Sequence, residues 1–239
     1  MPNEPEIVIR RATQQDLAAV MAWLSRENDE GVDGCFWCHS DIIKSSQAQG
    51  DLRVLLENGQ PVAFATGLIG IVEVRSDRRR KGLGARLVKD CMKLPRDPDL
   101  PGIYIECKPH TSVPFWKRMG FHILPEAQGR INAFQLIPLR HNLPELKPTT
   151  TVRIQIESED TNTPVEVQAA EIEPGRWQLQ ERFAAYTPNR SDTLVTVHLG
   201  GRIVYDQKKV KYLGGVGFNH GGTFCWLDVL EREVASYGK

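Results

Sequence analysis

The pattern of apolar and polar positions changes character along the chain. Before residue 140, apolar residues at helical spacing predict an amphipathic helix after Thr13, and a second helix begins at Ala85 and stops at Pro95. A short helix is expected around Phe115 and Met119. Between these helices, short apolar or alternating runs predict strands over 7–9, 52–56, 61–66, 69–74, 103–107 and 131–137.

Beyond residue 150 the alternation has period two almost throughout. It predicts strands over 152–156, 165–167, 177–179 and 194–205, whereas the segment from Trp226 to Ser236 shows helical spacing. The stretch between the two parts contains several prolines and few apolar residues, which is typical of a linker. We therefore predict a domain over 1–140, a linker over 141–150, and a small β-rich domain over 151–239 that ends in a helix.

Composition and charge narrow the classes of function. The chain has 239 residues, with 30 Lys and Arg against 30 Asp and Glu. Nucleic-acid affinity rests on a surplus of cations that neither part carries, so we expect no nucleic-acid partner. No apolar stretch approaches the roughly 20 residues that span a bilayer, so we expect no membrane partner. Five cysteines and no recognisable export signal favour reduced thiols and a cytoplasmic location.

A basic turn that contains two glycines connects the strand over 69–74 to the following helix. Its sequence is Arg79-Arg80-Lys81-Gly82-Leu83-Gly84. Glycines let the backbone turn sharply and let a ligand come close, and a helix start offers unpaired N–H groups that suit a pyrophosphate. A tight turn with solvated charges is the plainer interpretation, but strand, turn, helix and cations together favour a nucleotide phosphate. The cations that surround this place are Arg78, Arg79, Arg80, Lys81 and Arg86.

Two segments together resemble the GNAT superfamily of acyl-CoA N-acyltransferases. Arg79-x-x-Gly82-x-Gly84 is similar to the pyrophosphate signature of that family, Q/R-x-x-G-x-G/A, and the segment over 115–121 is similar to its later F-Y-x-x-L-G-F pattern. The resemblance covers about residues 6–138 and does not extend to 151–239. It implies an α/β (α+β) fold, in which a mixed, mostly antiparallel sheet is flanked by helices.

The resemblance also implies that acetyl-CoA is the co-substrate. Val74 would lie in the strand whose backbone pairs with the pantetheine arm, and an N–H group near it would steady the thioester oxygen. A bulge in that strand would splay it from the strand over 103–107 and open the slot for acetyl-CoA. The pyrophosphate would be held by the backbone amides of Arg79, Arg80, Lys81, Gly82, Leu83, Gly84 and Ala85.

The catalytic groups of the family are only partly matched. Trp116 stands where the family often has a tyrosine that protonates the leaving thiolate, and an indole N–H does not give up a proton at neutral pH. The family's frequent base position holds Leu68. The candidate bases are therefore Glu73 first, then Glu106 in the neighbouring strand, and then His110. A solvent-facing or salt-bridged carboxylate is the alternative for both glutamates.

The segment Cys35-Phe36-Trp37-Cys38-His39 lies where the resembled fold lines the acceptor site. Phe36 and Trp37 are therefore candidates for the floor of a substrate pocket, with a place in the hydrophobic core as the equal alternative. The sequence lacks a second pair of metal ligands at the usual spacing, so we expect no metal.

Two functions are consistent with these features. The first is an N-acetyltransferase that moves an acetyl group from acetyl-CoA to a primary amine of a small molecule or protein. The alternative is a non-catalytic module that binds acetyl-CoA and acts through a protein partner, because Trp116 and Leu68 replace groups that handle protons. The segment 151–239 could supply substrate recognition, form a dimer, cover the acceptor site or bind a protein partner, and its residues do not decide among these roles.

Overall fold

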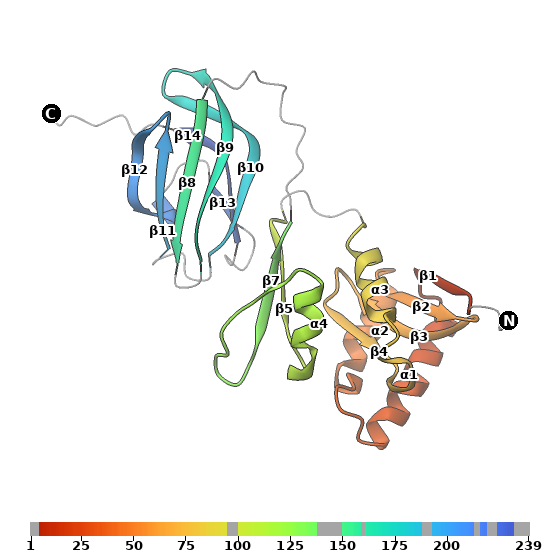
Figure 1. Ribbon diagram of the computed structural model, residues 1–239. Helices are drawn as coiled ribbons and strands as arrows, with labels where there is room; N and C mark the ends of the chain where they lie inside the picture. Colours follow the sequence, from red (N-terminus) through yellow and green to blue (C-terminus); the bar gives the residue numbers. More distant parts are fainter. Residues whose placement is uncertain are drawn as a thin grey trace. The chain divides into compact units, whose positions relative to one another are not determined.

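The computed structural model describes residues 5–94, 100–137, 150–158, 161–187, 193–212, 216–218 and 224–231 (Figure 1). It contains two compact units. One comprises Met1–Pro95 and Ile105–Gly120, and the other comprises Arg96–Tyr104 and Phe121–Lys239. Pro95, the predicted helix stop, and residues 141–149 of the predicted linker lie outside the described residues. The predicted division of the chain at 141–150 remains a prediction.

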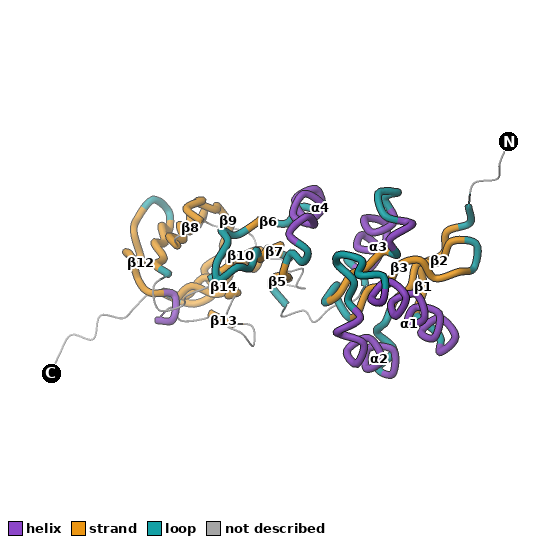
Figure 2. Tube along the Cα trace, turned by 90° about the horizontal axis from the view of Figure 1, so that it is seen from below, coloured by secondary structure: helices purple, strands orange, loops and turns teal. Residues whose placement is uncertain are grey.

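The first unit is built on an antiparallel sheet with the strand order β1-β2-β3-β4. Helices α1 and α2 lie on one face of this sheet, and α3 lies on the opposite face (Figure 2). The hydrophobic core of the unit lies between α1, α2 and the sheet, and includes Val20, Leu24, Ile43, Val54 and Phe64. The elements are β1 (Ile7–Arg11), α1 (Gln14–Asp29), α2 (Ser40–Ala48), β2 (Arg53–Glu57), β3 (Gln60–Thr66), β4 (Ile71–Val74), α3 (Leu83–Cys91) and α4 (Val113–Arg118).

Helix α1 begins where the sequence predicted it. The side chain of Thr13 accepts the Asp16 N–H, and the Asp16 carboxylate accepts the Thr13 N–H at 2.7 Å, which is a complete capping box. Val20 and Leu24 then face the core, and the same stripe reaches Glu27 in the last turn of the helix, where the side chain is also buried. The stripe of α1 thus places a carboxylate beside the sheet.

The second unit contains a seven-stranded antiparallel sheet with the order β12-β11-β8-β9-β10-β14-β13. The predicted β-rich character of this region is therefore confirmed. A three-stranded sheet, β5-β7-β6, is formed by β5 (Gly102–Glu106), β6 (His122–Ile123) and β7 (Asn132–Leu136). The strands of the larger sheet are β8 (Thr150–Ser158), β9 (Thr161–Glu173), β10 (Arg176–Tyr186), β11 (Leu194–Leu199), β12 (Arg202–Lys209), β13 (Val216–Phe218) and β14 (Phe224–Glu231).

The predicted helix from Trp226 to Ser236 is wrong for the residues that the structure describes. Those residues belong to β14, which pairs with β10 on one side and β13 on the other. Cys225 and Leu227 point into the core with period two, and the register shift between Gln178 and Phe183 of β10 lets Leu230 reach the same core. Paired backbone hydrogen bonds on both sides of the strand thus outweigh the helical spacing of the leucines.

A small aromatic cluster joins the shorter strands of the second unit to its large sheet. Leu124 and Phe134, from the 121–137 segment, pack with Tyr186 of β10 and Phe224 of β14. The rings of Phe134 and Tyr186 are stacked, with centroids 4.2 Å apart. Gly102 of β5 comes so close to Phe224 that an added Cβ would lie 2.6 Å from its ring. A glycine at this position is therefore needed for the close packing.

Candidate functional site

The glycine turn forms the start of α3 by adopting two left-handed residues. Arg80 has a φ of 66°, and Gly82, the N-cap of α3, has a φ of 78°. The first hydrogen bond of the helix runs from the Arg86 N–H to the Gly82 carbonyl. The N–H groups of Leu83, Gly84 and Ala85 therefore precede the first helical hydrogen bond, which is the arrangement that binds anions at helix starts.

The two glycines of the turn have different structural roles. Gly82 supplies the left-handed backbone, and no atom lies within 4 Å of the place where its Cβ would be. At Gly84 an added Cβ would lie 3.2 Å from the Val74 side chain and 3.6 Å from the Phe115 ring. Gly84 thus lets the first turn of α3 approach β4 and α4 closely, whereas Gly82 leaves open space at the start of the helix.

The cations of the turn divide into two groups. Arg78 forms ion pairs with Glu57 and Asp77, so it is already engaged with carboxylates. Arg80, Lys81 and Arg86 are exposed around the helix start. The side chain of Arg79 is partly exposed, at 34%, and reaches toward two buried acids of the unit.

β4 is the last strand of its sheet, so its outer edge at Val74 pairs with no other strand among the described residues. Arg75, the residue after the strand, donates its N–H to the Val62 carbonyl of β3, and alternate residues of a strand point their N–H and C=O groups to opposite sides. The Val74 N–H and C=O therefore point away from β3, and the Val74 carbonyl accepts a hydrogen bond from Arg79 Nε at 2.9 Å. Strands β4 and β5 belong to separate sheets. The predicted slot for acetyl-CoA between them remains a prediction.

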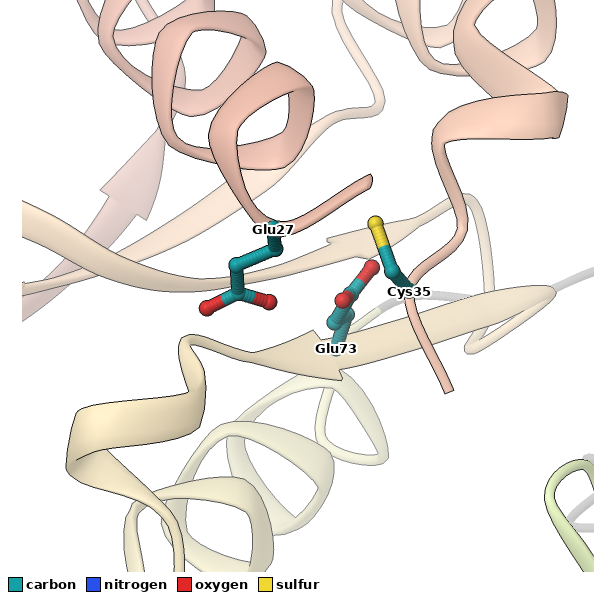
Figure 3. A group of neighbouring side chains, drawn as sticks. All are labelled: Glu27, Cys35 and Glu73. Carbon is teal, nitrogen blue, oxygen red and sulfur yellow. The ribbon is translucent and has the colours of Figure 1, made fainter. Parts of the chain in front are cut away.

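Glu73 lies in β4 with its side chain buried at 3% exposure. One carboxylate oxygen, Oε2, accepts the Phe36 N–H at 3.0 Å. Glu27 from α1 and Cys35 point toward the same place, so that one oxygen of each glutamate and the Cys35 Sγ lie within 4.8 Å of one another (Figure 3). The Cys35 thiol donates to the Leu24 carbonyl at 3.4 Å. Two acids and a thiol from three separate segments thus meet inside the unit.

Arg79 is the cation that faces this cluster. Its Nη1 donates to the Asp33 carbonyl at 2.8 Å, and its Nη2 lies 3.8 Å from Glu73 Oε1 and 3.8 Å from Glu27 Oε2. Those two oxygens are buried and have no hydrogen-bond partner among the described residues. The arginine that opens the glycine motif therefore compensates the charge of the buried acids. Its backbone N–H donates to the Ser76 carbonyl. The predicted part of Arg79 in binding phosphate remains a prediction.

The surroundings of Glu73 favour its neutral form. Burial raises the pKa of Glu73 to about 8; the Phe36 N–H and Arg79 act in the opposite direction, and the Glu27 charge adds to the rise. Burial also raises the pKa of the Cys35 thiol, and the two glutamates contribute to that effect. A carboxyl group whose pKa lies close to neutral is suited to accept a proton at physiological pH.

The other predicted site residues lie in different environments. Glu106 at the end of β5 and His110 are exposed. Trp116 is buried at 7% exposure, and its ring makes an edge contact with Phe115 at 4.9 Å. Trp37 packs against the core of α1 and α2, whereas Phe36 supplies the N–H group that binds Glu73.

Glu27 is the residue of the cluster that sequence reasoning missed. Its signal is its position on the apolar stripe of α1, four residues after Trp23 and on the same face as Val20 and Leu24. A carboxylate on the buried face of an amphipathic helix requires a partner in the interior. Which partner it meets depends on packing across the sheet and is not visible in the local pattern.

The comparisons with known proteins agree with the predicted family. Residues 17–121 match the model of the acetyltransferase (GNAT) family. The predicted resemblance is therefore confirmed for these residues, which match a family of acetyltransferases. No curated protein sequence matches the chain.

Solved structures are similar to just over half of the chain. The PaiA N-acetyltransferase of Thermoplasma acidophilum in complex with coenzyme A is 14% identical and covers 55% of this chain and 99% of its own, with a TM-score of 0.44. The polyamine N-acetyltransferase of Drosophila melanogaster is 13% identical and covers 55% of this chain and 100% of its own, with a TM-score of 0.44. A GNAT-family acetyltransferase of Bacillus cereus is 14% identical and covers 55% and 96%, with a TM-score of 0.43.

Among the described residues, the structure has no helix that is both long and apolar enough to cross a bilayer.

Proposed function

We propose that this protein transfers an acetyl group from acetyl-CoA to a primary amine, with Glu73 as the general base. The observation that carries the proposal is the position of Glu73. It is a buried carboxyl group with a pKa of about 8, in the strand that leads directly into the glycine turn of a GNAT domain. An acid of this kind is costly to bury, and acid–base catalysis gives a reason for it to be there.

Acetyl-CoA would be held by the backbone at both ends of this segment. The N–H groups of Leu83, Gly84 and Ala85 would bind the pyrophosphate, and exposed Arg80 and Lys81 would add charge around it. The outer edge of β4 at Val74 would pair with the pantetheine arm. In this arrangement the Val74 N–H is positioned to donate to the thioester oxygen as it gains negative charge.

Glu73 would take the proton from the ammonium group of the acceptor through water, because its side chain is buried. The amine nitrogen then attacks the thioester carbon and the C–S bond breaks. The proton that the nitrogen loses as the amide forms goes, directly or through water, to the departing thiolate of coenzyme A. Trp116 is buried and its indole cannot serve as an acid. An alkyl thiol with a pKa near 8.5 is a fair leaving group without such help.

The test compares two isosteric variants. Glu73→Gln keeps an oxygen for the Phe36 N–H and removes the base, so kcat/KM for acetyl transfer should fall by roughly 10²–10⁴-fold while acetyl-CoA still binds. Glu106→Gln, at the exposed glutamate of β5, should leave the rate unchanged. Transfer is followed by separating coenzyme A from acetyl-CoA chromatographically with a panel of primary amines. Binding of acetyl-CoA by calorimetry with no turnover on any amine would support the non-catalytic module instead.

A further inference from the structure

The proposed mechanism uses Glu73 and leaves the second buried acid without a role. Glu27 is 4% exposed, and its Oε1 accepts the Ser76 N–H at 2.6 Å, at the point where the chain leaves β4 and enters the glycine turn. Its other oxygen, Oε2, has no hydrogen-bond partner among the described residues, and neither has Oε1 of Glu73. Both oxygens lie 3.8 Å from the same nitrogen of Arg79. The two acids therefore share one cation.

Two glutamates and a cysteine are also the kinds of side chain that bind a divalent metal ion. Arg79 argues against that interpretation here. Its guanidinium cannot lose its charge, and its Nε and Nη1 are fixed by the carbonyl groups of Val74 and Asp33. A metal ion that bridged the two carboxylates would meet this fixed positive charge at close range in a buried site, where repulsion is strong.

The charge balance of the cluster supports a different role. Two ionised acids beside one guanidinium would leave a net negative charge in the interior, and such a charge is costly without water. A single proton held by the pair removes that cost. The charged and titratable groups that face Glu73 are Glu27 from α1, Arg79 from the turn and, from the segment before α2, Cys35.

We infer that Glu27 is a positioning residue of the acetyl-transfer site, which shares Arg79 with Glu73 and thereby sets how readily Glu73 releases its proton to water before it acts as the base. This inference rests on the proposed function. The Glu27 side chain also accepts the Ser76 N–H and thereby connects α1 to the start of the glycine turn. The same side chain thus positions both the base and the segment that would bind acetyl-CoA.

The direction of the electrostatic effect makes the inference testable. The negative charge of Glu27 contributes to the raised pKa of Glu73, and Arg79 acts in the opposite direction. Glu27→Gln removes the negative charge and keeps an acceptor for the Ser76 N–H. Glu73 should then ionise more readily, and the acid limb of the kcat/KM profile should move to lower pH. Arg79→Gln should move the same limb to higher pH.

The experiment measures kcat/KM for one amine from pH 6 to pH 9 in the full-length protein. In Glu27→Gln the ratio of the rate at pH 6.5 to that at pH 8.5 should rise at least about threefold over the unmodified chain. The matched control is Glu30→Gln, at the exposed C-cap of the same helix, whose profile should coincide with that of the unmodified protein. Glu27→Asp, which keeps the charge, should retain most of the original profile.

Several outcomes separate this inference from the proposed function. A purely structural role of Glu27 would lower the rate equally at every pH, and an unshifted acid limb in a folded, active Glu27→Gln protein would overturn the inference while leaving Glu73 as the base. If Glu27→Gln does not fold, the opposite shift expected of Arg79→Gln decides the question. A protein with no turnover on any amine removes the proposed function, and the inference with it.

Discussion

The Nη2 atom of Arg79 lies 3.8 Å from Oε1 of Glu73. The side chain of the first residue of the glycine motif therefore faces a buried acid of β4 instead of the start of α3. The same side chain holds the Val74 carbonyl through Nε. A single residue therefore connects the outer edge of β4, the glycine turn and the candidate base.

Binding of acetyl-CoA is expected to depend on the exposed cations at the start of α3. Replacing Arg80 and Lys81 together by glutamate reverses the charge where the pyrophosphate would lie, so the Kd measured by calorimetry should rise by roughly 10-fold or more, and the effect should weaken with added salt. Lys89→Glu, an exposed change near the other end of the same helix, should bind acetyl-CoA normally. Equal affinities in all three proteins would remove the turn from the site.

The close contact at Gly84 predicts a graded loss of stability. Gly84→Ala places a Cβ 3.2 Å from the Val74 side chain, where a shift of a few tenths of an ångström is enough, and the better helix propensity of alanine offsets part of the cost. Gly84→Val adds two further methyl groups against Val74 and Phe115 and should cost roughly 1–3 kcal/mol. Chemical denaturation measures both. A valine variant as stable as the alanine variant would contradict the packing.

The raised pKa of Glu73 predicts a specific pH dependence of stability. The usual pKa of 4.5 applies to the unfolded chain and about 8 to the folded chain, so the contribution of the protonated side chain is fully present below pH 4.5 and is lost as pH rises to about 8. Glu73→Gln has no such loss. Its free energy of unfolding, relative to the unmodified chain, should therefore increase between pH 5 and pH 8 by at most about 4 kcal/mol.

That difference is measured by denaturant unfolding at each pH. Glu106→Gln, at an exposed glutamate, is the control for the loss of one carboxylate. A pH-independent difference for Glu73→Gln would mean that Glu73 is ionised in the folded protein throughout.

The aromatic cluster of the second unit predicts a coupling between Gly102 and Phe224. Gly102→Ala brings a Cβ to within 2.6 Å of the Phe224 ring, which is 1% exposed and cannot easily move aside, so the change should cost roughly 1–3 kcal/mol. In a Phe224→Leu background the same change should cost much less, which a double-mutant cycle measures. Ile203→Ala, at an exposed position of β12, is the control for a neutral change. Additive effects at Gly102 and Phe224 would argue against their contact.

Three of the five thiols should differ in reactivity in the folded protein. Cys38 is exposed and should react with a disulfide reagent in the folded protein. Burial raises the pKa of Cys91 to about 11 and that of Cys225 to about 12, so these thiols should react only on unfolding. Mass spectrometry of the labelled peptides identifies each site. Fast labelling of Cys225 in the folded protein would place β14 outside the core.

Much of the fold could be predicted because its signals are local. The capping box at Thr13, the apolar stripe of α1 and the two glycines of the turn act within a few residues of one another, and all three are present in the structure. Local spacing was misleading at Trp226, where leucines at helical intervals lie in a strand. Pairing with β10, which is distant in sequence, and with the neighbouring β13 decides the conformation there.

The sequence by itself determined the class of the N-terminal domain, the position of the glycine turn and the choice of Glu73 as the first candidate base. These features could be predicted because motifs and hydrophobic periodicity depend only on residues that are close in sequence. The tertiary structure alone decided that Glu27 and Cys35 meet Glu73, and that Arg79 turns inward to the two acids. The reason is that a buried charge requires a polar or charged partner, and the packing of segments that are distant in sequence decides which residue lies close enough to be that partner. The local sequence pattern does not contain this information.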